Sequence, residues 1–244
     1  MIGNLRLAAR LAMLVAALLG ALAMHGLWRL FRLPSPWPRL FLGGVARIVG
    51  ARVRVVGTPL RREVVFLANH LSWIDILAIA GATGSAFVAK GELSTVPLVG
   101  WLCRLNRTIF VTREDRLQVT AQIERLRAAL GQGGGVTIFP EGTTGDGVTL
   151  LPFKAALLAA LDPPPAGVMV QPIRIDYGPA TGELAWIGDE PGQAHALRVL
   201  RRRGTFPVTL HLLPPFDPAR AGGRKGIATA ARDAIVQSMP APNE

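Results

Sequence analysis

Seven short apolar segments, separated by helix-like or turn-forming stretches, constrain the fold of this 244-residue chain more than any other feature. Most of them are rich in the β-branched and aromatic residues that favour strands. The segments are Arg52–Val56, Val64–Ala68, Ala86–Ala89, Thr108–Val111, Val136–Phe139, Val168–Ile175 and Val208–Leu212. Strands that alternate with helices form α/β sheets with helices on both faces. We therefore predict a central, mostly parallel seven-stranded sheet flanked by helices.

The clearest predicted helix follows Thr112 and ends at Gly131. Its first turn contains Glu114 and Asp115, whose charges suit the positive end of a helix dipole. Apolar residues then recur at helical spacing, at Val119, Ile123, Leu126 and Leu130. Three further helices are predicted, over residues 153–161, 193–203 and 228–238.

Positive charge is concentrated at the N-terminus of the chain. The first 62 residues contain ten arginines and no acid, whereas the rest contains 17 basic and 16 acidic residues. Residues 11–24 form an apolar run inside this basic segment. Basic residues beside an apolar run favour an anionic membrane surface, and nucleic-acid-binding arms lack such a run. We expect membrane lipids as partners, and no nucleic acid.

The proline-rich segment Pro34–Pro38 ends this N-terminal unit, because prolines interrupt helices. We predict a basic, apolar membrane anchor over residues 1–38 and a globular domain over residues 39–244. The 14-residue apolar run is shorter than the roughly 20 residues that span a bilayer, so the anchor either spans marginally or lies partly embedded. A cleaved signal peptide is the alternative, but the basic, aromatic segment Leu27–Arg32 stands where its cleavage site would lie.

The cysteine and histidine content excludes several kinds of site. Cys103 is the single cysteine, so the chain forms no internal disulfide and gives no sign of needing an oxidising compartment. No two histidines have the spacing of helical metal ligands, and we predict no metal site. Gly133–Gly135 follows a predicted helix and precedes a strand, the reverse of a dinucleotide-binding loop. The sequence predicts a reducing compartment, at the cytoplasmic face of the cell membrane. It does not indicate the oligomeric state.

His70 and Asp75 are the strongest candidates for chemistry. They lie just after the predicted strand Val64–Ala68, where the next helix begins, and Ser72 is expected to cap that helix. A histidine with a nearby carboxylate is the usual arrangement of a general base and the group that orients it. A lone histidine is more often a structural residue, so His70 needs support from other motifs.

Two further predicted strands end in polar side chains. The residues are Arg113 after the strand 108–111, and Glu141, Gly142, Thr143 and Thr144 after the strand 136–139. Ligands of parallel α/β sheets sit outside the carboxyl ends of the strands, so these side chains and His70 can converge. An arginine there can bind a phosphate through two hydrogen bonds, although a surface ion pair with Glu114 or Asp115 is the alternative.

These motifs resemble those of the glycerophospholipid acyltransferase superfamily, specifically its bacterial 1-acylglycerol-3-phosphate acyltransferases, over about residues 50–215. His70 and Asp75 match the first motif of the family, and Phe139–Gly142 matches its Phe-Pro-Glu-Gly motif. The resemblance implies transfer of a fatty acyl chain to the free hydroxyl of a lysolipid, first of all 1-acylglycerol-3-phosphate, to give phosphatidate. The implied donor is an acyl carrier protein or coenzyme A thioester, and no other cofactor is implied. His70 would act as the base and Asp75 would orient it.

The chain departs from the family pattern at two places. Arg107 and Thr112 replace a glycine and an aspartate of the second motif, in which Arg113 remains as the implied phosphate ligand. Thr144 stands where many members have an arginine, and the segment Thr143–Gly147 resembles the branch that includes lyso-ornithine-lipid acyltransferases. Two acceptors therefore stay open, as do a lipid hydrolase and a non-catalytic lipid-binding protein.

Overall fold

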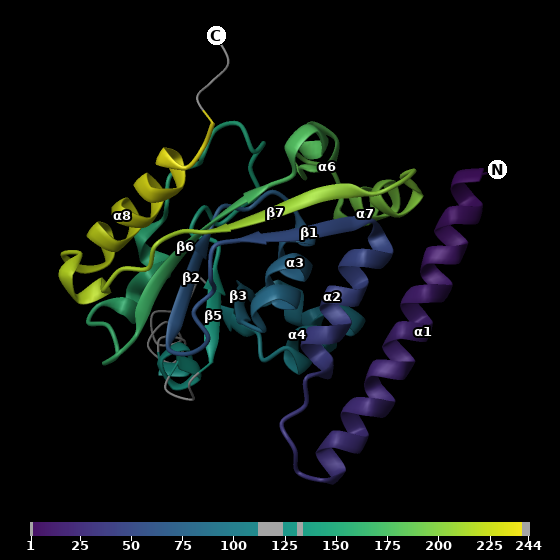
Figure 1. The fold of residues 1–244 in the computed structure, drawn as a ribbon, viewed down its shortest axis with the longest axis horizontal. Helices are drawn as coiled ribbons and strands as arrows, with labels where there is room; N and C mark the ends of the chain where they lie inside the picture. The colour runs from purple at the N-terminus through teal and green to yellow at the C-terminus, as the bar shows by residue number, and fades with distance from the viewer. Residues whose placement is uncertain (1, 112–123, 131–133, 241–244) are drawn as a thin grey trace.

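The computed structural model describes residues 2–111, 124–130 and 134–240. Within these ranges seven strands form one sheet, in the order β1-β7-β6-β2-β5-β3-β4 (Figure 1). The strands are β1 (Ala51–Val56), β2 (Val64–Ala68), β3 (Ala86–Lys90), β4 (Ile109–Val111), β5 (Gly135–Ile138), β6 (Met169–Asp176) and β7 (Phe206–Leu212). Every strand boundary lies within two residues of the predicted one.

The sheet is mostly parallel, as predicted. Only the pairing of β6 with β7 is antiparallel among the strand pairs of the described residues. β2 lies near the centre, where Leu67 is level with Pro172 of β6 on one side and with Ile138 of β5 on the other. The carboxyl ends of β2, β5 and β6 therefore lie side by side at one edge of the sheet.

The α-helices lie on both faces of the sheet (Figure 1). In the described ranges they are α1 (Ile2–Leu30), α2 (Trp37–Val49), α3 (Trp73–Thr83), α4 (Pro97–Leu105), α6 (Thr181–Leu184), α7 (Gly192–Arg201) and α8 (Gly223–Gln237). Residues 124–130 are also helical, and the short 3₁₀ helices are η1 (Gly91–Thr95), η2 (Ala155–Leu161), η3 (Gly178–Ala180) and η4 (Pro218–Arg220).

Two apolar cores separate the helices from the sheet. One core lies beneath α2 and α3, and the other lies beneath α8, η2 and residues 124–130. Successive residues of β2 alternate between them, so Phe66 lies in the first core and Leu67 in the second. This alternation is the period-2 pattern of a strand that is covered on both faces.

Among the described α-helices of at least two turns, α2 and α4 were not predicted, and both have a proline in the first turn. Pro38 lies in the first turn of α2 and Pro97 opens α4. Proline is tolerated there, because the first amides of a helix lack intrahelical partners in any case. The boundary predicted between residues 38 and 39 consequently falls inside α2, and the division into anchor and globular domain stays a prediction.

Two predicted helices differ in detail from the structure. The segment predicted as residues 153–161 forms a 3₁₀ helix over Ala155–Leu161, in which the three-residue repeat places the fully buried Leu158 and Leu161 on one face. Helix α8 starts at Gly223, five residues before its predicted start at 228, since its first turns lack apolar periodicity. Much of the helix predicted after Thr112 lies outside the described residues.

Helix α1 runs along the outside of α2 and reaches α7 (Figure 1). Leu7 and Leu14 pack against the core beneath α2, but none of residues 2–30, all of which are described, is buried. Arg10 donates hydrogen bonds to the carbonyl oxygens of Val199 (3.0 Å) and Leu200 (3.1 Å) near the end of α7. Helix α1 is long and apolar enough to cross a bilayer, and its outward face presents apolar side chains.

Candidate active site

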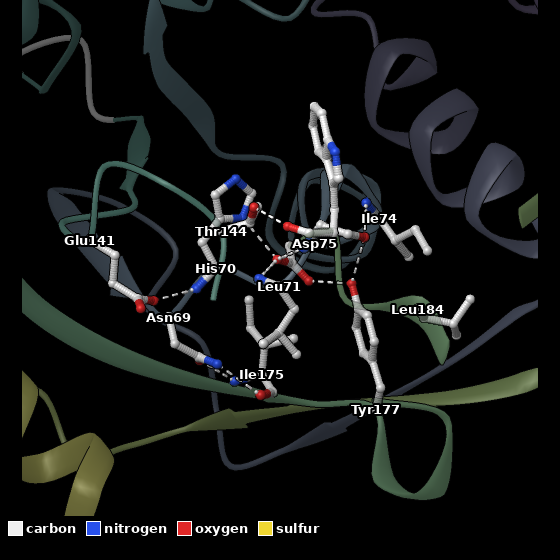
Figure 2. Close-up of polar contacts among 12 residues, drawn as sticks. Asn69, His70, Leu71, Ile74, Asp75, Glu141, Thr144, Ile175, Tyr177 and Leu184 are labelled. Atoms are coloured by element: carbon white, nitrogen blue, oxygen red, sulfur yellow. Dashed lines mark hydrogen bonds and ion pairs between the residues drawn. The ribbon is translucent and has the colours of Figure 1, made fainter. Parts of the chain in front are cut away.

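The candidate site forms where the carboxyl ends of β2, β5 and β6 meet. Asn69 follows β2 directly, and its side-chain amide pairs with the backbone of Ile175 on β6. The amide nitrogen donates to the Ile175 carbonyl (3.0 Å), and the amide oxygen accepts from the Ile175 nitrogen (2.7 Å) (Figure 2). Asn69 thus continues the strand pairing through its side chain and fixes the start of the loop that contains His70.

His70 Nδ1 lies 2.9 Å from Asp75 Oδ2 (Figure 2). The Asp75 side chain is fully buried, whereas 17% of the His70 side chain is exposed. Because Asp75 accepts the Nδ1 hydrogen, the neutral imidazole has its lone pair on Nε2. The predicted pair is therefore assembled, with the second ring nitrogen available to a substrate.

The start of α3 explains the spacing between His70 and Asp75. Ser72 is the N-cap residue, as predicted, and its hydroxyl accepts a hydrogen bond from the Ile74 amide (3.1 Å). Asp75 is the third residue of the helix, and its carboxylate reaches back to the amides of Leu71 (2.6 Å) and Ser72 (3.0 Å). A side chain at this helix position naturally points back at the cap. A histidine two residues before the cap therefore meets the same carboxylate.

The imidazole plane is fixed by an aromatic neighbour. The rings of His70 and Phe139 are stacked, with centroids 3.9 Å apart and planes inclined by 15°. Phe139 in turn stacks on Phe87 of β3 at 6.0 Å. Offset aromatic stacking and the bond to Asp75 together limit rotation of the ring.

Glu141 holds the loop after β5 against the loop after β2. Its Oε1 accepts from the His70 amide (2.7 Å) and its Oε2 accepts from the Leu151 amide (3.1 Å). In the same loop, the Gly145 amide donates to the His70 carbonyl (2.7 Å). Only 3% of Glu141 is exposed, and this burial raises the pKa of its carboxyl group to about 7 despite the two amide donors. Glu141 and His70 are brought together as predicted.

The other predicted residues of this loop differ in exposure and in their contacts. Gly142 has φ 69°, a left-handed conformation that glycine adopts readily, and its amide donates to the Phe139 carbonyl (3.1 Å) within the turn. Thr143 is exposed, whereas the Thr144 hydroxyl donates to the Trp186 carbonyl. Arg113 lies outside the described residues.

The sequence analysis missed Tyr177. It follows β6, is fully buried, and its hydroxyl donates to Asp75 Oδ1 (Figure 2). Burial, followed by the charge of Asp75, raises the pKa of Tyr177 well above its ordinary value. Its position at the carboxyl end of a strand beside β2 was the available signal, because that edge was already predicted to hold the site.

The other histidines have structural partners. His195 is buried and accepts at Nδ1 from Trp73 Nε1 (2.9 Å), so its other nitrogen donates to the Leu184 carbonyl (3.1 Å). Burial lowers the pKa of His195. His211 accepts from Arg174 (2.8 Å). In the part of the chain that the structure describes, no three His, Cys, Asp or Glu side chains gather as a metal site.

A polar cleft adjoins the site, and an apolar groove lies between three of the helices. The open cleft is lined by polar residues of the site and by the end of α8. Its lining includes Asn69, His70, Glu141, Arg174 and Met239. The apolar groove lies between α1, α2 and α4, and its lining includes Leu18, Leu22, Phe41, Leu102 and Leu105.

The sequence profile of the Acyltransferase family matches residues 52–176, a region that contains His70, Asp75 and Glu141. A lyso-ornithine lipid O-acyltransferase of Rhodobacter capsulatus is 33% identical, over 97% of this chain and 91% of the relative. The chain belongs to the glycerophospholipid acyltransferase superfamily. This acyltransferase also shares 36% identity with a 1-acyl-sn-glycerol-3-phosphate acyltransferase of Neisseria gonorrhoeae, over 49% of the chain and 46% of that relative.

A solved structure supports the fold of this acyltransferase. The crystal structure of the 1-acyl-sn-glycerophosphate acyltransferase PlsC of Thermotoga maritima aligns with a TM-score of 0.64. The alignment covers 97% of this chain and 100% of that one, at 24% sequence identity. The agreement includes the α/β architecture with an apolar helix at its N-terminus.

Proposed function

We propose that this acyltransferase moves a fatty acyl chain from an acyl thioester to the free hydroxyl of a lyso-ornithine lipid. The observation that supports the chemistry is the geometry of His70, whose Nδ1 is bound by the buried carboxylate of Asp75. Nε2 is left to accept a proton, which is the requirement for a general base. Metal ions and further cofactors have no part in the proposed reaction.

In the proposed reaction His70 Nε2 takes the proton of the acceptor hydroxyl while its oxygen attacks the thioester carbonyl carbon. Asp75 stabilises the imidazolium that forms, because its carboxylate lies 2.9 Å from Nδ1. The tetrahedral intermediate collapses with cleavage of the carbon–sulfur bond, and the imidazolium returns the proton to the leaving thiolate. The ester and the free thiol are the products, and a thioester is reactive enough for direct transfer without an acyl-enzyme.

The choice of acceptor rests on two observations. Lyso-ornithine lipid O-acyltransferases match nearly the whole chain, including one of Brucella abortus that is 31% identical over 96% of it. Thr144 offers no cation to a phosphate, and its hydroxyl is already donated to the Trp186 carbonyl. Lysophosphatidate, the first acceptor suggested by the sequence, is the alternative.

The proposed roles of the loop residues follow from their contacts. Glu141 acts through the loops, because both carboxylate oxygens accept backbone amides and the side chain is buried. Gly142 forms the turn, and Thr143 and Thr144 contact the acceptor or shape its path. The proposed role of Arg113, binding an anionic group of the acceptor, rests on its sequence motif alone.

The N-terminal region supports a reaction at a lipid surface. Helix α1 has an exposed apolar face, and the apolar groove between α1, α2 and α4 has a lining suited to hydrocarbon chains. We propose acyl carrier protein or coenzyme A as the carrier of the acyl donor. The proposed location is the cytoplasmic face of the cell membrane, where both thioesters are present.

The decisive experiment uses membranes that contain the full chain. The donors are labelled acyl thioesters of acyl carrier protein and of coenzyme A. Lyso-ornithine lipid and lysophosphatidate are supplied in parallel, and His70→Ala membranes give the background. We expect label in ornithine lipid with the higher kcat/KM. Label in phosphatidate alone would overturn the proposed acceptor, and fatty acid released without any acceptor would indicate a hydrolase.

A further inference from the structure

We propose that Tyr177 is a positioning residue of the reaction, which sets the orientation and charge of Asp75 and through it the basicity of His70. The inference rests on the proposed function of the His70–Asp75 pair. Tyr177 is not expected to touch the substrate, because its side chain is fully buried.

The hydrogen bonds of Asp75 divide between its two oxygens. Oδ2 accepts from His70 Nδ1 and from the amides of Leu71 and Ser72. Oδ1 accepts from the Tyr177 hydroxyl. The two amides belong to the cap of α3 and move with Asp75. Tyr177 is therefore the donor that ties the carboxylate to a different part of the fold.

Tyr177 connects the cap of α3 to the end of β6. It stands directly after β6, and its ring packs against Phe206 of β7 with centroids 6.3 Å apart. Asn69 makes a second connection to the same strand end through Ile175. The start of the loop is thus fixed to β6 by Asn69, and the Asp75 carboxylate is fixed to the end of β6 by Tyr177. A fixed carboxylate keeps the imidazole in one tautomer and one orientation, on which transfer of the proton depends.

The hydroxyl direction follows from its two neighbours. The Tyr177 hydroxyl has a single hydrogen, which it donates to Asp75. In its contact with Ser72, at 3.2 Å, the Ser72 hydroxyl is therefore the donor. The hydrogen bonds from Ser72 to Tyr177 and from Tyr177 to Asp75 stabilise the negative charge of the Asp75 carboxylate. If the Tyr177 hydroxyl is removed, Asp75 holds the Nδ1 proton of His70 more strongly, and a protonated imidazole becomes harder to deprotonate. The titratable groups around Asp75 are His70, Tyr177 and Glu141.

The test compares Tyr177→Phe with the wild-type protein, using the acceptor that the wild-type protein prefers. We expect kcat to fall about tenfold with little change in KM, the scale of a hydrogen bond to a charged group. The acidic limb of the kcat/KM profile should move to higher pH by about one unit, because His70 must be neutral to act. A loss of packing alone would leave that limb in place.

A second measurement changes the hydroxyl without removing it. Tyr177 is the single tyrosine of the chain, so biosynthetic incorporation of 3-fluorotyrosine alters this position alone. The more acidic phenol donates a stronger hydrogen bond to Asp75, and the acidic limb should move to lower pH, opposite to the shift for Tyr177→Phe. This variant retains the ring and the hydroxyl, and it tests the inference even if Tyr177→Phe folds poorly.

Thr137→Val is the matched control. The Thr137 hydroxyl is fully buried on β5 and forms its hydrogen bond with Ser85 Oγ (2.7 Å) rather than with His70 or Asp75. This variant should lose stability without any shift of the limb. If the limb stays unchanged in both tyrosine variants while wild-type transfer is normal, the inference about Tyr177 fails. If the wild-type protein transfers no acyl chain to either acceptor, the proposed function itself fails.

Discussion

The loop from Asn69 to Asp75 and the helix α1 are attached to the same domain in different ways. In the loop, the buried groups of Asn69, His70 and Asp75 have hydrogen-bond partners on β6, on α3, in the loop after β5 or within the loop itself. Helix α1 has no buried residue in its described span, Ile2–Leu30, and its polar contacts to α7 lie near one end. Full satisfaction of buried polar groups fixes a position closely, whereas a partly exposed apolar face leaves room to adapt.

This difference suits the two tasks that we assign to the regions. Proton transfer requires atoms that are held within a few tenths of an ångström, and the loop meets that demand through hydrogen bonds. A lipid surface is fluid and offers no fixed partners, so an exposed apolar helix face is sufficient there. Changes in the loop should therefore affect rate strongly, and changes in α1 should affect attachment weakly.

The largest effect is expected for His70→Ala. Loss of the base should lower kcat by about 10² to 10⁴, the range of general base catalysis, while the melting temperature stays close to that of the wild-type protein. Acyl transfer and thermal unfolding are measured on the same membranes. The control is His211→Gln, which keeps an acceptor for Arg174 and should retain activity. Near-normal transfer by His70→Ala would exclude the proposed mechanism.

A smaller effect on stability is expected from Glu141. Its pKa is raised from 4.5 to about 7 in the folded protein, so the folded state binds this proton more tightly than the unfolded chain does. The free energy of unfolding should therefore fall as the pH rises from about 4.5 to about 7, by on the order of 3 kcal/mol. Below this pH window Glu141 causes no loss of stability, and above it the loss of stability is complete.

Thermal unfolding of Glu141→Gln between pH 4 and pH 8 isolates this contribution. The variant has no titrating carboxyl group at this position, so its stability should decline less over the window than that of the wild-type protein. Glu92→Gln removes an exposed carboxyl group in η1 and serves as the control. Equal pH dependence of the Glu141 variant and the wild-type protein would contradict the raised pKa.

The smallest effect is expected for Arg10→Ala in α1. The change removes hydrogen bonds to the carbonyls of Val199, Leu200 and Gly204, a loss of about 1 to 2 kcal/mol in docking of the helix. Backbone amides of α1 should exchange hydrogen several-fold faster in lipid nanodiscs, with little change in kcat. Arg29→Ala, in the last turn of the same helix, is the control. Identical exchange in the two variants would show that α1 is held by its apolar contacts alone.

Much of the fold could be predicted because its signals are local. β-branched runs such as Val64–Ala68 identify strands that are buried on both faces, and Ser72 identifies a helix cap by its own hydroxyl. The helices α2 and α4 could not be predicted in the same way, because Pro38 and Pro97 also occur where helices end. Only the packing around them shows that these prolines start a helix.

The sequence by itself determined the strands, the superfamily motifs and the pairing of His70 with Asp75, because residues five apart at a helix start meet through the geometry of the cap. The tertiary structure alone decided that Glu141 holds the backbone of His70 and that Tyr177 completes the hydrogen bonds of Asp75. Those contacts join residues 71 and 102 positions apart. They depend on the order of strands in the sheet, because β5 and β6 lie beside β2 only through pairing of segments that are far apart in the sequence.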